Sequence, residues 1–380
     1  MDLLGSRNKC IVCDCNSLTE VYCLQNVPAF MGTTLNDPCD DALAPLEFLA
    51  CDACGVIQIQ NPLPIDLVYL KSHGAGSIGG VWLEHHQKFG EFLIRHATGS
   101  VLEIGGGSHG TLSRYCSSKQ EFDWTVVDKD ANSSRYEQGV NVVSKLYGAD
   151  LKLPQEFETC VHSHFFEHLY QPDLFLKLIE KNNHATKKMV FSVPNFNRML
   201  ELGYIGTLDF EHTYTATEEC MRFLMQRAGY EIEEVEYFKD HSVFMSYVKC
   251  SVETPESSPN PGWLLDPKIS GVYFANFEQT LADLHTKIID SSASAVFLFG
   301  AHTFSQFLLA RYEALSQMCT IIDNDPNKQG QRLYGTDRVV HNPNELAYCE
   351  SPLVITSTTG AYKNEIEAQC LQINSTCSFG

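Results

Sequence analysis

Two Cys-x-x-Cys pairs lie near the amino end of the sequence, Cys10 with Cys13 and Cys51 with Cys54. One such turn places two sulfur atoms within reach of one ion, and two turns complete the four-thiolate tetrahedron that zinc prefers. Four cysteines leave no open position, so we expect a structural zinc that folds a segment lacking a core of its own. The alternative is a set of buried thiols without metal. Three further cysteines could replace one ligand: Cys15, Cys23 and Cys39.

A glycine-rich segment follows the apolar run 101–105 and precedes a helical segment. Its glycines, among them Gly105 and Gly107, allow a tight turn and a close approach of the backbone to a ligand. Enzymes that use NAD, FAD or S-adenosylmethionine all contain such loops. The acid Glu103 ahead of the first glycine favours S-adenosylmethionine as the cofactor, because a nicotinamide site usually has an apolar residue there.

Two further acids are candidates for the same cofactor site. Asp128 ends the β-rich run 124–128, where a carboxylate can accept hydrogen bonds from both ribose hydroxyls. Asp150 stands where the loop after the third strand would cover an adenine ring. The alternative for Asp150 is a solvated loop acid.

Residues 162–172 (HSHFFEHLYQP) follow the fourth expected strand and contain three histidines and a glutamate. In doubly wound sheets the carboxyl ends of the strands line the ligand crevice. We therefore expect His164 on the cofactor side of this crevice and His168 among the catalytic residues. The alternative is that the Phe-Glu-His sequence caps a helix.

Glu211 and His212 stand in a later loop, just before the last helix of the same unit. A carboxylate next to a histidine can hold the imidazole in one tautomer and raise its basicity. The pair therefore suggests a general base in a loop that closes over the crevice. The alternative is a Glu-His pair on the surface.

Alternating strands and helices must position these residues, and the sequence predicts two α/β units. In the first, we expect helices at 82–98, 174–184 and 215–229, and strands at 101–105, 124–128, 160–166, 189–194, 230–238 and 242–250. In the second, we expect helices at 277–290, 303–315 and 362–372, and strands at 295–300, 319–325 and 352–357. Strand–helix alternation predicts a doubly wound sheet, and the pair 230–250 predicts an antiparallel edge.

The expected organisation has three parts: an irregular zinc-binding module at 1–75, the first α/β unit at 76–252, and a second, Rossmann-like α/β unit at 263–380. The linker between the α/β units is expected at 253–262, which is rich in proline, serine and asparagine. The length of 380 residues agrees with two or three domains.

A net charge of −20 makes nucleic acids and anionic membranes poor candidates as partners. No apolar run approaches the roughly 18 residues of a membrane span, and the amino end lacks a secretory signal. Fifteen scattered cysteines fit the reduced thiols of a cytoplasmic protein better than a disulfide framework. We expect a cytoplasmic monomer or homodimer that acts on a small molecule.

Taken together, these motifs resemble the NDP-sugar C-methyltransferases of deoxysugar biosynthesis. That family has a zinc-binding amino-terminal domain, a central class I S-adenosylmethionine (SAM) methyltransferase domain and a carboxy-terminal Rossmann-like domain. The resemblance covers nearly the whole chain. It rests on the four paired cysteines, Glu103-Ile-Gly105, Glu167-His168, Glu211-His212, and the segment Asn324–Gly330 with Gly335-Thr336.

The resemblance implies a substrate and a mechanism. The substrate would be a nucleotide-linked 4-keto-6-deoxy sugar. His212 would remove the proton from the carbon next to the ketone, Glu211 would orient the His212 ring, and His168 would stabilise the enolate. The enolate carbon would then take the methyl group of SAM.

The chain departs from the family pattern at several points. Asp209 stands where the family usually has tyrosine, and the glycine-rich loop is one residue longer. A tyrosine-repeating stretch is reduced to Tyr69-Leu-Lys-Ser72-His73. An O-methyltransferase of a sugar or small metabolite, a zinc-ribbon RNA methyltransferase and a non-catalytic nucleotide-binding protein therefore remain as alternatives.

Overall fold

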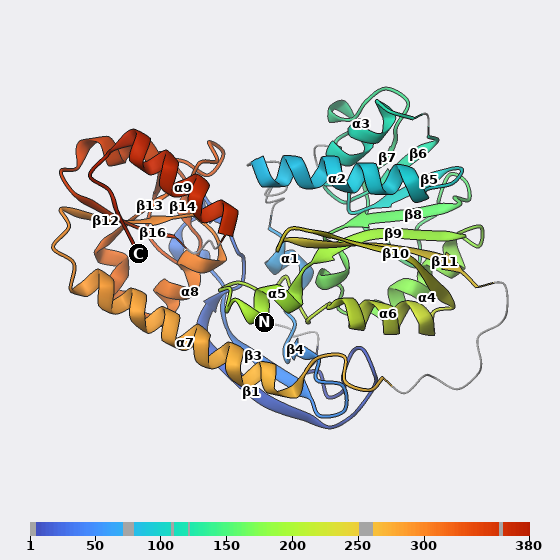
Figure 1. Cartoon of the computed structure of the whole chain (residues 1–380), viewed down its shortest axis with the longest axis horizontal. Coiled ribbons are helices and arrows are strands. Elements are labelled where there is room, and N and C mark those ends of the chain that lie inside the picture. The colour runs from blue at the N-terminus through green and yellow to red at the C-terminus, as the bar shows by residue number, and fades with distance from the viewer. Residues whose placement is uncertain (1–4, 71–79, 108–109, 121, 251–260, 357–359) are drawn as a thin grey trace.

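The computed structural model describes residues 5–70, 80–107, 110–120, 122–250, 261–356 and 360–380. The expected boundary at residue 75 and most of the expected linker lie outside these ranges. A seven-stranded and a five-stranded sheet form two separate units, and the amino-terminal strands lie beneath and between them (Figure 1).

The seven-stranded sheet has the order β10-β11-β9-β8-β5-β6-β7. β11 runs antiparallel to both of its neighbours, and the other pairs are parallel. This order confirms the predicted doubly wound sheet of the class I SAM methyltransferase type, with its reversed strand near one edge. The strands are β5 (Val101–Ile104), β6 (Trp124–Val127), β7 (Asn141–Val143), β8 (Thr159–Ser163), β9 (Lys188–Pro194), β10 (Tyr230–Phe238) and β11 (Ser242–Lys249).

Helices cover both faces of this sheet (Figure 1). On one face lie α2 (Gly80–His96) and α3 (Thr111–Ser117), and on the other α4 (Pro172–Asn182) and α6 (Glu218–Arg227). A short helix, α5 (Phe196–Glu201), follows β9. α2 buries its apolar side against the sheet, and His85 is fully buried on that side.

The carboxy-terminal unit has a five-stranded sheet of order β15-β13-β12-β16-β17, and every pair in it is parallel. This confirms the predicted second Rossmann-like unit. Its strands are β12 (Ala295–Phe299), β13 (Cys319–Ile322), β15 (Val340–His341), β16 (Pro352–Thr356) and β17 (Ser378–Phe379). Its helices are α7 (Pro267–Ile289), α8 (Thr303–Arg311) and α9 (Gly360–Ile373).

The amino-terminal segment is more regular than the sequence suggested. It forms an antiparallel sheet of order β1-β3-β4, which comprises β1 (Leu18–Pro28), β3 (Leu43–Cys51) and β4 (Ile57–Ile59). The sheet shares its core with α7, where Tyr22 stacks on Phe274 with ring centroids 4.7 Å apart and Phe48 lies 5.1 Å from the same ring. The prediction of an irregular segment was therefore wrong, because its apolar residues pack against a helix from a distant part of the chain.

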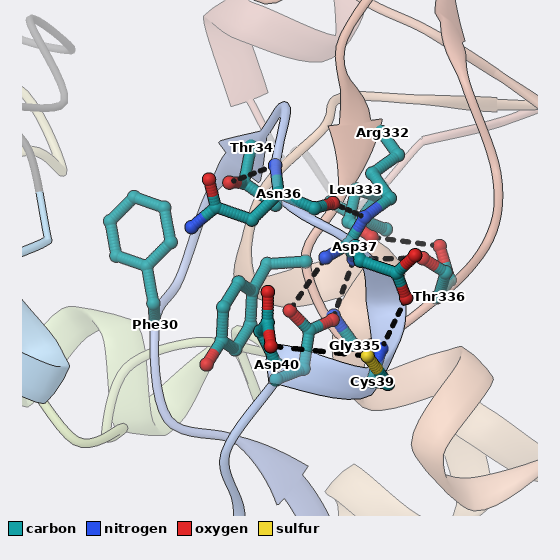
Figure 2. A network of polar contacts seen from close by, with 12 residues as sticks. Phe30, Thr34, Asn36, Asp37, Cys39, Asp40, Arg332, Leu333, Gly335 and Thr336 are labelled. Atoms are coloured by element: carbon teal, nitrogen blue, oxygen red, sulfur yellow. Dashed lines mark hydrogen bonds and ion pairs between the residues drawn. The ribbon is translucent and has the colours of Figure 1, made fainter.

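The amino-terminal segment also joins the carboxy-terminal unit through a two-stranded ladder, β2 (Thr33–Thr34) with β14 (Arg332–Leu333). Figure 2 shows the polar network around this ladder. The Arg332 guanidinium donates two hydrogen bonds of 2.6 and 2.7 Å to the Asp41 carboxylate. The same carboxylate accepts the N–H of Gly335 at 2.7 Å. Both charged side chains are nearly buried, so this pair ties the two segments firmly together.

Short elements complete the chain: α1 (Ile65–Val68), η1 (Pro38–Asp40), η3 (Ser133–Arg135), η4 (Phe166–His168), η5 (Glu313–Gln317) and η6 (Pro343–Tyr348). None of the helices in the described part of the chain has the length and apolar character needed to cross a membrane.

Candidate functional site

The four paired cysteines converge on one point. The Sγ atoms of Cys10, Cys13, Cys51 and Cys54 all lie within 4.8 Å of one another. Cys10 Sγ lies 3.7 Å from Cys54 Sγ, and Cys13 Sγ lies 3.6 Å from Cys51 Sγ. Two sulfurs bound to one tetrahedral zinc at about 2.3 Å are about 3.8 Å apart. The donor set and its spacing therefore fit a four-thiolate zinc.

The two turns that carry the four cysteines are joined to the loop that carries His212. β4 begins three residues after Cys54, and it pairs with the chain just beyond His212. The N–H of Ile59 donates to the Thr213 carbonyl at 3.0 Å, and the N–H of Thr215 donates to the Ile57 carbonyl at 2.9 Å. The segment of the four cysteines thus holds, through β4, one side of the loop that contains the candidate base.

The glycine-rich loop lies between β5 and α3, as predicted. Gly105 and Gly107 have φ values of +77° and +67°, which side chains rarely adopt. A Cβ on Gly107 would have no atom within 4 Å, so this part of the loop is open to a ligand. Asp128 lies directly beside it, since its carboxylate accepts the Gly107 N–H at 3.0 Å and the Asp130 N–H at 2.7 Å. An open backbone next to a strand-end carboxylate fits the ribose part of SAM.

Glu103 lies beneath the loop. It is 4 % exposed, and its Oε2 accepts the indole N–H of Trp124 at 2.8 Å. Burial raises the pKa of Glu103 to about 7. These contacts place Glu103 as a support for the glycine-rich loop, so a direct contact with the cofactor stays a prediction.

Asp150 is exposed and lies in the loop after β7, where it lines a shallow hollow within residues 145–151. Its position after the third strand of the unit is the one expected from the sequence. Its role over an adenine ring stays a prediction.

The loop after β5 meets the segment after β8. A Cβ on Gly105 would lie 2.8 Å from the ring of Phe165, so only glycine permits this close approach. β6 pairs with one side of β5 and β8 with the other, so the strand order reverses here. Open α/β sheets bind their ligands at this switch point, outside the carboxyl ends of the strands.

The three histidines at the end of β8 and just beyond it, His162, His164 and His168, lie in three different environments. His162 is fully buried and stacks on Phe191 with ring centroids 4.8 Å apart, so it belongs to the core. His164 has an unusual φ of +49°, and its Nε2 lies 2.8 Å from the Ser242 hydroxyl. The His164 ring lies beside the ring of His241, with centroids 5.5 Å apart, and a contact of His164 with the cofactor stays a prediction.

His168 and His212 form a pair, as the resemblance implied. Their ring centroids are 5.0 Å apart, and one ligand atom from each lies within 4.8 Å of a carboxylate oxygen of Glu167. Glu167 is fully buried, and burial raises its pKa to about 7. Its Oε1 lies 3.8 Å from His168 Nε2. Two histidines and a buried carboxylate thus share one corner of the switch-point crevice.

The tautomer of His212 follows from its hydrogen bond. Nδ1 of His212 lies 3.1 Å from the Thr207 carbonyl, which can only accept. Nδ1 therefore carries the hydrogen, and Nε2 of the neutral ring has a free lone pair, as a general base requires. The Thr207 carbonyl orients the ring, which was the role expected for Glu211.

The surrounding acids set the basicity of His212. Burial alone would lower its pKa, but the carboxylates of Asp209, Glu167 and Glu211 outweigh burial and raise the pKa above its usual value. Glu211 therefore raises the pKa of His212 through its negative charge. The result is a stronger base than an ordinary histidine.

Tyr69 holds His168 from the other side. The Tyr69 hydroxyl lies 2.7 Å from His168 Nδ1, and the Tyr69 carbonyl accepts a hydrogen bond from Lys129 at 3.0 Å. Lys129 directly follows Asp128, so Tyr69 links the cofactor side of the crevice to the histidine pair.

Sequence reasoning missed the contributions of Tyr69, Thr207 and Asp209. Tyr69 stands in the reduced tyrosine-repeating stretch, which was the one available signal. Thr207 acts through its backbone carbonyl, which no sequence pattern reveals. Asp209 looked like a lost tyrosine, yet its carboxylate accepts the N–H groups of both Glu211 and His212 at 2.8 Å.

Comparisons with known proteins add little to these observations. No protein-family model and no curated protein matches the chain. Among solved structures, a SAM-dependent methyltransferase from Mesorhizobium loti is 13 % identical, with 44 % of this chain and 100 % of that chain covered and a TM-score of 0.34.

Two other solved structures are similar to the same degree. The 1,6-didemethyltoxoflavin-N1-methyltransferase of Burkholderia thailandensis is 13 % identical over 47 % of this chain and 81 % of that chain, with a TM-score of 0.36. Magnesium protoporphyrin IX methyltransferase of Synechocystis PCC 6803 is 13 % identical over 45 % and 85 %, with a TM-score of 0.34. Similarities this weak carry no information on substrate or residue roles, so the fold assignment rests on the strand order.

Proposed function

We propose that this protein is a SAM-dependent methyltransferase that methylates a carbon next to the ketone of a nucleotide-linked keto-deoxysugar. One observation carries the proposal: Gly105 packs on Phe165 at the switch point. The candidate cofactor loop therefore meets the segment after β8 that leads to His168, at the carboxyl ends of the strands. The resemblance of the motifs to NDP-sugar C-methyltransferases supports the choice of substrate.

On this proposal, the loop around Gly105 and Gly107 and the carboxylate of Asp128 bind SAM, with Glu103 supporting the loop from below. When bound, SAM supplies an electrophilic methyl group. The four cysteines bind a structural zinc, which takes no part in the chemistry.

His212 is the proposed base. A C–H proton next to a ketone is too weakly acidic for unaided removal at pH 7, so the site must supply both a base and stabilisation of the oxyanion. Nε2 of His212 takes the proton from carbon, and the electron pair of the broken C–H bond moves toward the ketone oxygen. The carboxylates of Asp209, Glu167 and Glu211 stabilise the imidazolium that results.

His168 is the proposed partner of the ketone oxygen. Because one imidazole cannot both take the carbon proton and stabilise the oxyanion, a second group is needed. His168 lies beside His212 and is fixed by the Tyr69 hydroxyl, so a hydrogen bond from Nε2 can meet the developing negative charge. The enolate carbon would then form the new bond to the methyl group while the bond between that methyl group and the SAM sulfur breaks, with S-adenosylhomocysteine as the leaving group.

A transfer assay with labelled SAM tests this proposal. The purified protein is incubated with methyl-labelled SAM and a nucleotide-linked 4-keto-6-deoxy sugar, and the product is analysed by NMR. A methyl group on carbon next to the ketone is expected. A methyl group on oxygen would replace the proposal by an O-methyltransferase, and SAM binding without any transfer to nucleotide sugars would exclude this substrate class.

A further inference from the structure

A second cluster of metal-binding side chains lies apart from the four cysteines. It consists of His85 in α2, His164 after β8 and His241 in the turn between β10 and β11. Each offers one ring nitrogen, and these three nitrogens lie within 4.8 Å of one another. We propose that these three histidines bind a divalent transition metal, with zinc as the first candidate.

The arrangement of the rings supports a common ion. The ring centroids are 5.1 Å apart for His85 and His164, 5.4 Å for His85 and His241, and 5.5 Å for His164 and His241. Three imidazoles around one tetrahedral zinc, with Zn–N bonds of about 2.0 Å, have ring centres roughly 5 Å apart. The near-equal spacing in the structure matches that arrangement, so small side-chain rotations suffice to bring all three nitrogens to the ion.

His85 gives the second, independent reason. It is fully buried, and neither of its ring nitrogens has a hydrogen-bond partner in the part of the chain that the structure describes. A buried polar group left without a partner destabilises the folded chain, so such a group calls for an explanation. His162 is similarly buried and unpartnered, and its ring contacts are with phenylalanines. His85 also packs against phenylalanines, but its ring in addition meets the rings of His164 and His241.

The Ser242 hydroxyl and the Glu167 carboxylate lie beside the cluster. The Ser242 hydroxyl lies 2.8 Å from His164 Nε2 and 2.5 Å from His241 Nδ1, so it marks the point on which the two rings converge. On the other side of the His164 ring, Nδ1 lies 3.5 Å from the buried Oε1 of Glu167. A ligating histidine usually donates its second N–H to a carboxylate. Glu167, whose oxygens have no hydrogen-bond partner among the described residues, stands beside this nitrogen.

The Trp82 ring covers the cluster, with its centroid 4.6–5.2 Å from the rings of His85, His164 and His241. An indole in this position keeps bulk water from the three nitrogens. Imidazole donors suit zinc, copper, iron or nickel better than magnesium or calcium, which prefer oxygen ligands. A bound ion would join α2 and the β10–β11 turn to the end of β8, beside Glu167 and the proposed active site.

Zinc binding to the full-length protein tests the inference. The protein is dialysed against zinc, freed of loose ions on a desalting column, and its zinc content is measured by mass spectrometry. We expect about two zinc ions per chain in the wild type, one at the four cysteines and one at the histidines. His85→Phe retains an aromatic ring among Phe89, Phe238 and Phe244, and should bind one zinc fewer while its four-cysteine zinc is kept.

Two controls complete the test. His184→Phe changes an exposed histidine outside the cluster and should leave the zinc content unchanged. If His85→Phe does not fold, His241→Gln serves in its place, and added zinc should raise the thermal midpoint of the wild type but not of this variant. A wild type that binds only the four-cysteine zinc, or a histidine variant with the same zinc content as the wild type, would overturn the inference.

Discussion

Asp209 joins the loop of His212 to the carboxy-terminal unit through Thr303. One carboxylate oxygen of Asp209 accepts the backbone N–H groups of Glu211 and His212, and the other accepts the hydroxyl of Thr303 at 3.3 Å. Thr303 is the first residue of α8. The residue that departs from the family's tyrosine thus shapes the candidate catalytic loop and anchors it to a second domain.

The charge of Asp209 should be visible in the pH dependence of the reaction. Asp209→Asn retains an acceptor oxygen for the two backbone N–H groups but removes a negative charge that raises the pKa of His212. His212 acts as a base only when unprotonated, so a lower pKa extends activity to lower pH. The acidic limb of a plot of kcat/KM against pH should therefore move to lower pH in this variant.

Thr303→Val is the matched control for this prediction. It removes the hydrogen bond to Asp209 but keeps the charge, so the acidic limb should stay at the pH of the wild type. An unchanged limb in Asp209→Asn would show that a group other than His212 controls the acidic side of the profile.

Asp128 is predicted to bind the ribose of SAM. Loss of a charge-assisted, two-oxygen contact costs about 1.5–3 kcal/mol. Asp128→Ala should therefore weaken SAM binding roughly ten- to a hundred-fold, as measured by calorimetry. Asp123→Ala changes an exposed acid at the opposite end of β6 and should bind SAM like the wild type. Equal SAM affinities in Asp128→Ala and Asp123→Ala would refute this placement.

The predicted zinc of the four cysteines should stabilise the chain and the loop of His212, which pairs with β4. A ligand present at a thousand times its Kd stabilises the folded state by about 4 kcal/mol. Cys51→Ser should lose this zinc and a comparable free energy of unfolding, and kcat should fall because β4 holds the chain beyond His212. Metal analysis and urea unfolding check both effects, with the exposed Cys39→Ser as control. Retention of the four-cysteine zinc in Cys51→Ser would contradict the assignment.

The Arg332–Asp41 pair should be essential for the junction of the amino- and carboxy-terminal segments. Arg332→Ala leaves the buried Asp41 carboxylate without its cation, and breaking such a pair costs about 3–5 kcal/mol. Arg114→Ala removes an exposed pair with Glu137 and should cost about 1 kcal/mol or less. Urea unfolding distinguishes the two, and a similar small loss in both variants would show that the buried pair is dispensable.

The sequence predicted the α/β units well because their signals are local. Apolar runs that end in Gly105 or Asp128 predict strands and the turns that follow them, and the paired cysteines predict their own convergence. The strands of the amino-terminal segment were missed because their core partner, Phe274, lies more than two hundred residues away in the chain.

The candidate site was only partly predictable for the same reason. His168 and His212 were expected together, but the carbonyl of Thr207 and the hydroxyl of Tyr69 reach them only in the folded chain. The contact of His164 with Ser242 was not predictable either, because it depends on a left-handed backbone at His164 that no sequence pattern reveals.

Hydrogen exchange at carbon tests the central claim most directly. The protein is mixed in heavy water with S-adenosylhomocysteine and a nucleotide-linked 4-keto-6-deoxy sugar, so that deprotonation can occur without methyl transfer. We expect deuterium to enter the carbon next to the ketone with the wild type, and His212→Ala to stop this exchange while SAM affinity is nearly unchanged. A wild-type enzyme that methylates its substrate but exchanges no carbon-bound proton would contradict C-methylation through His212.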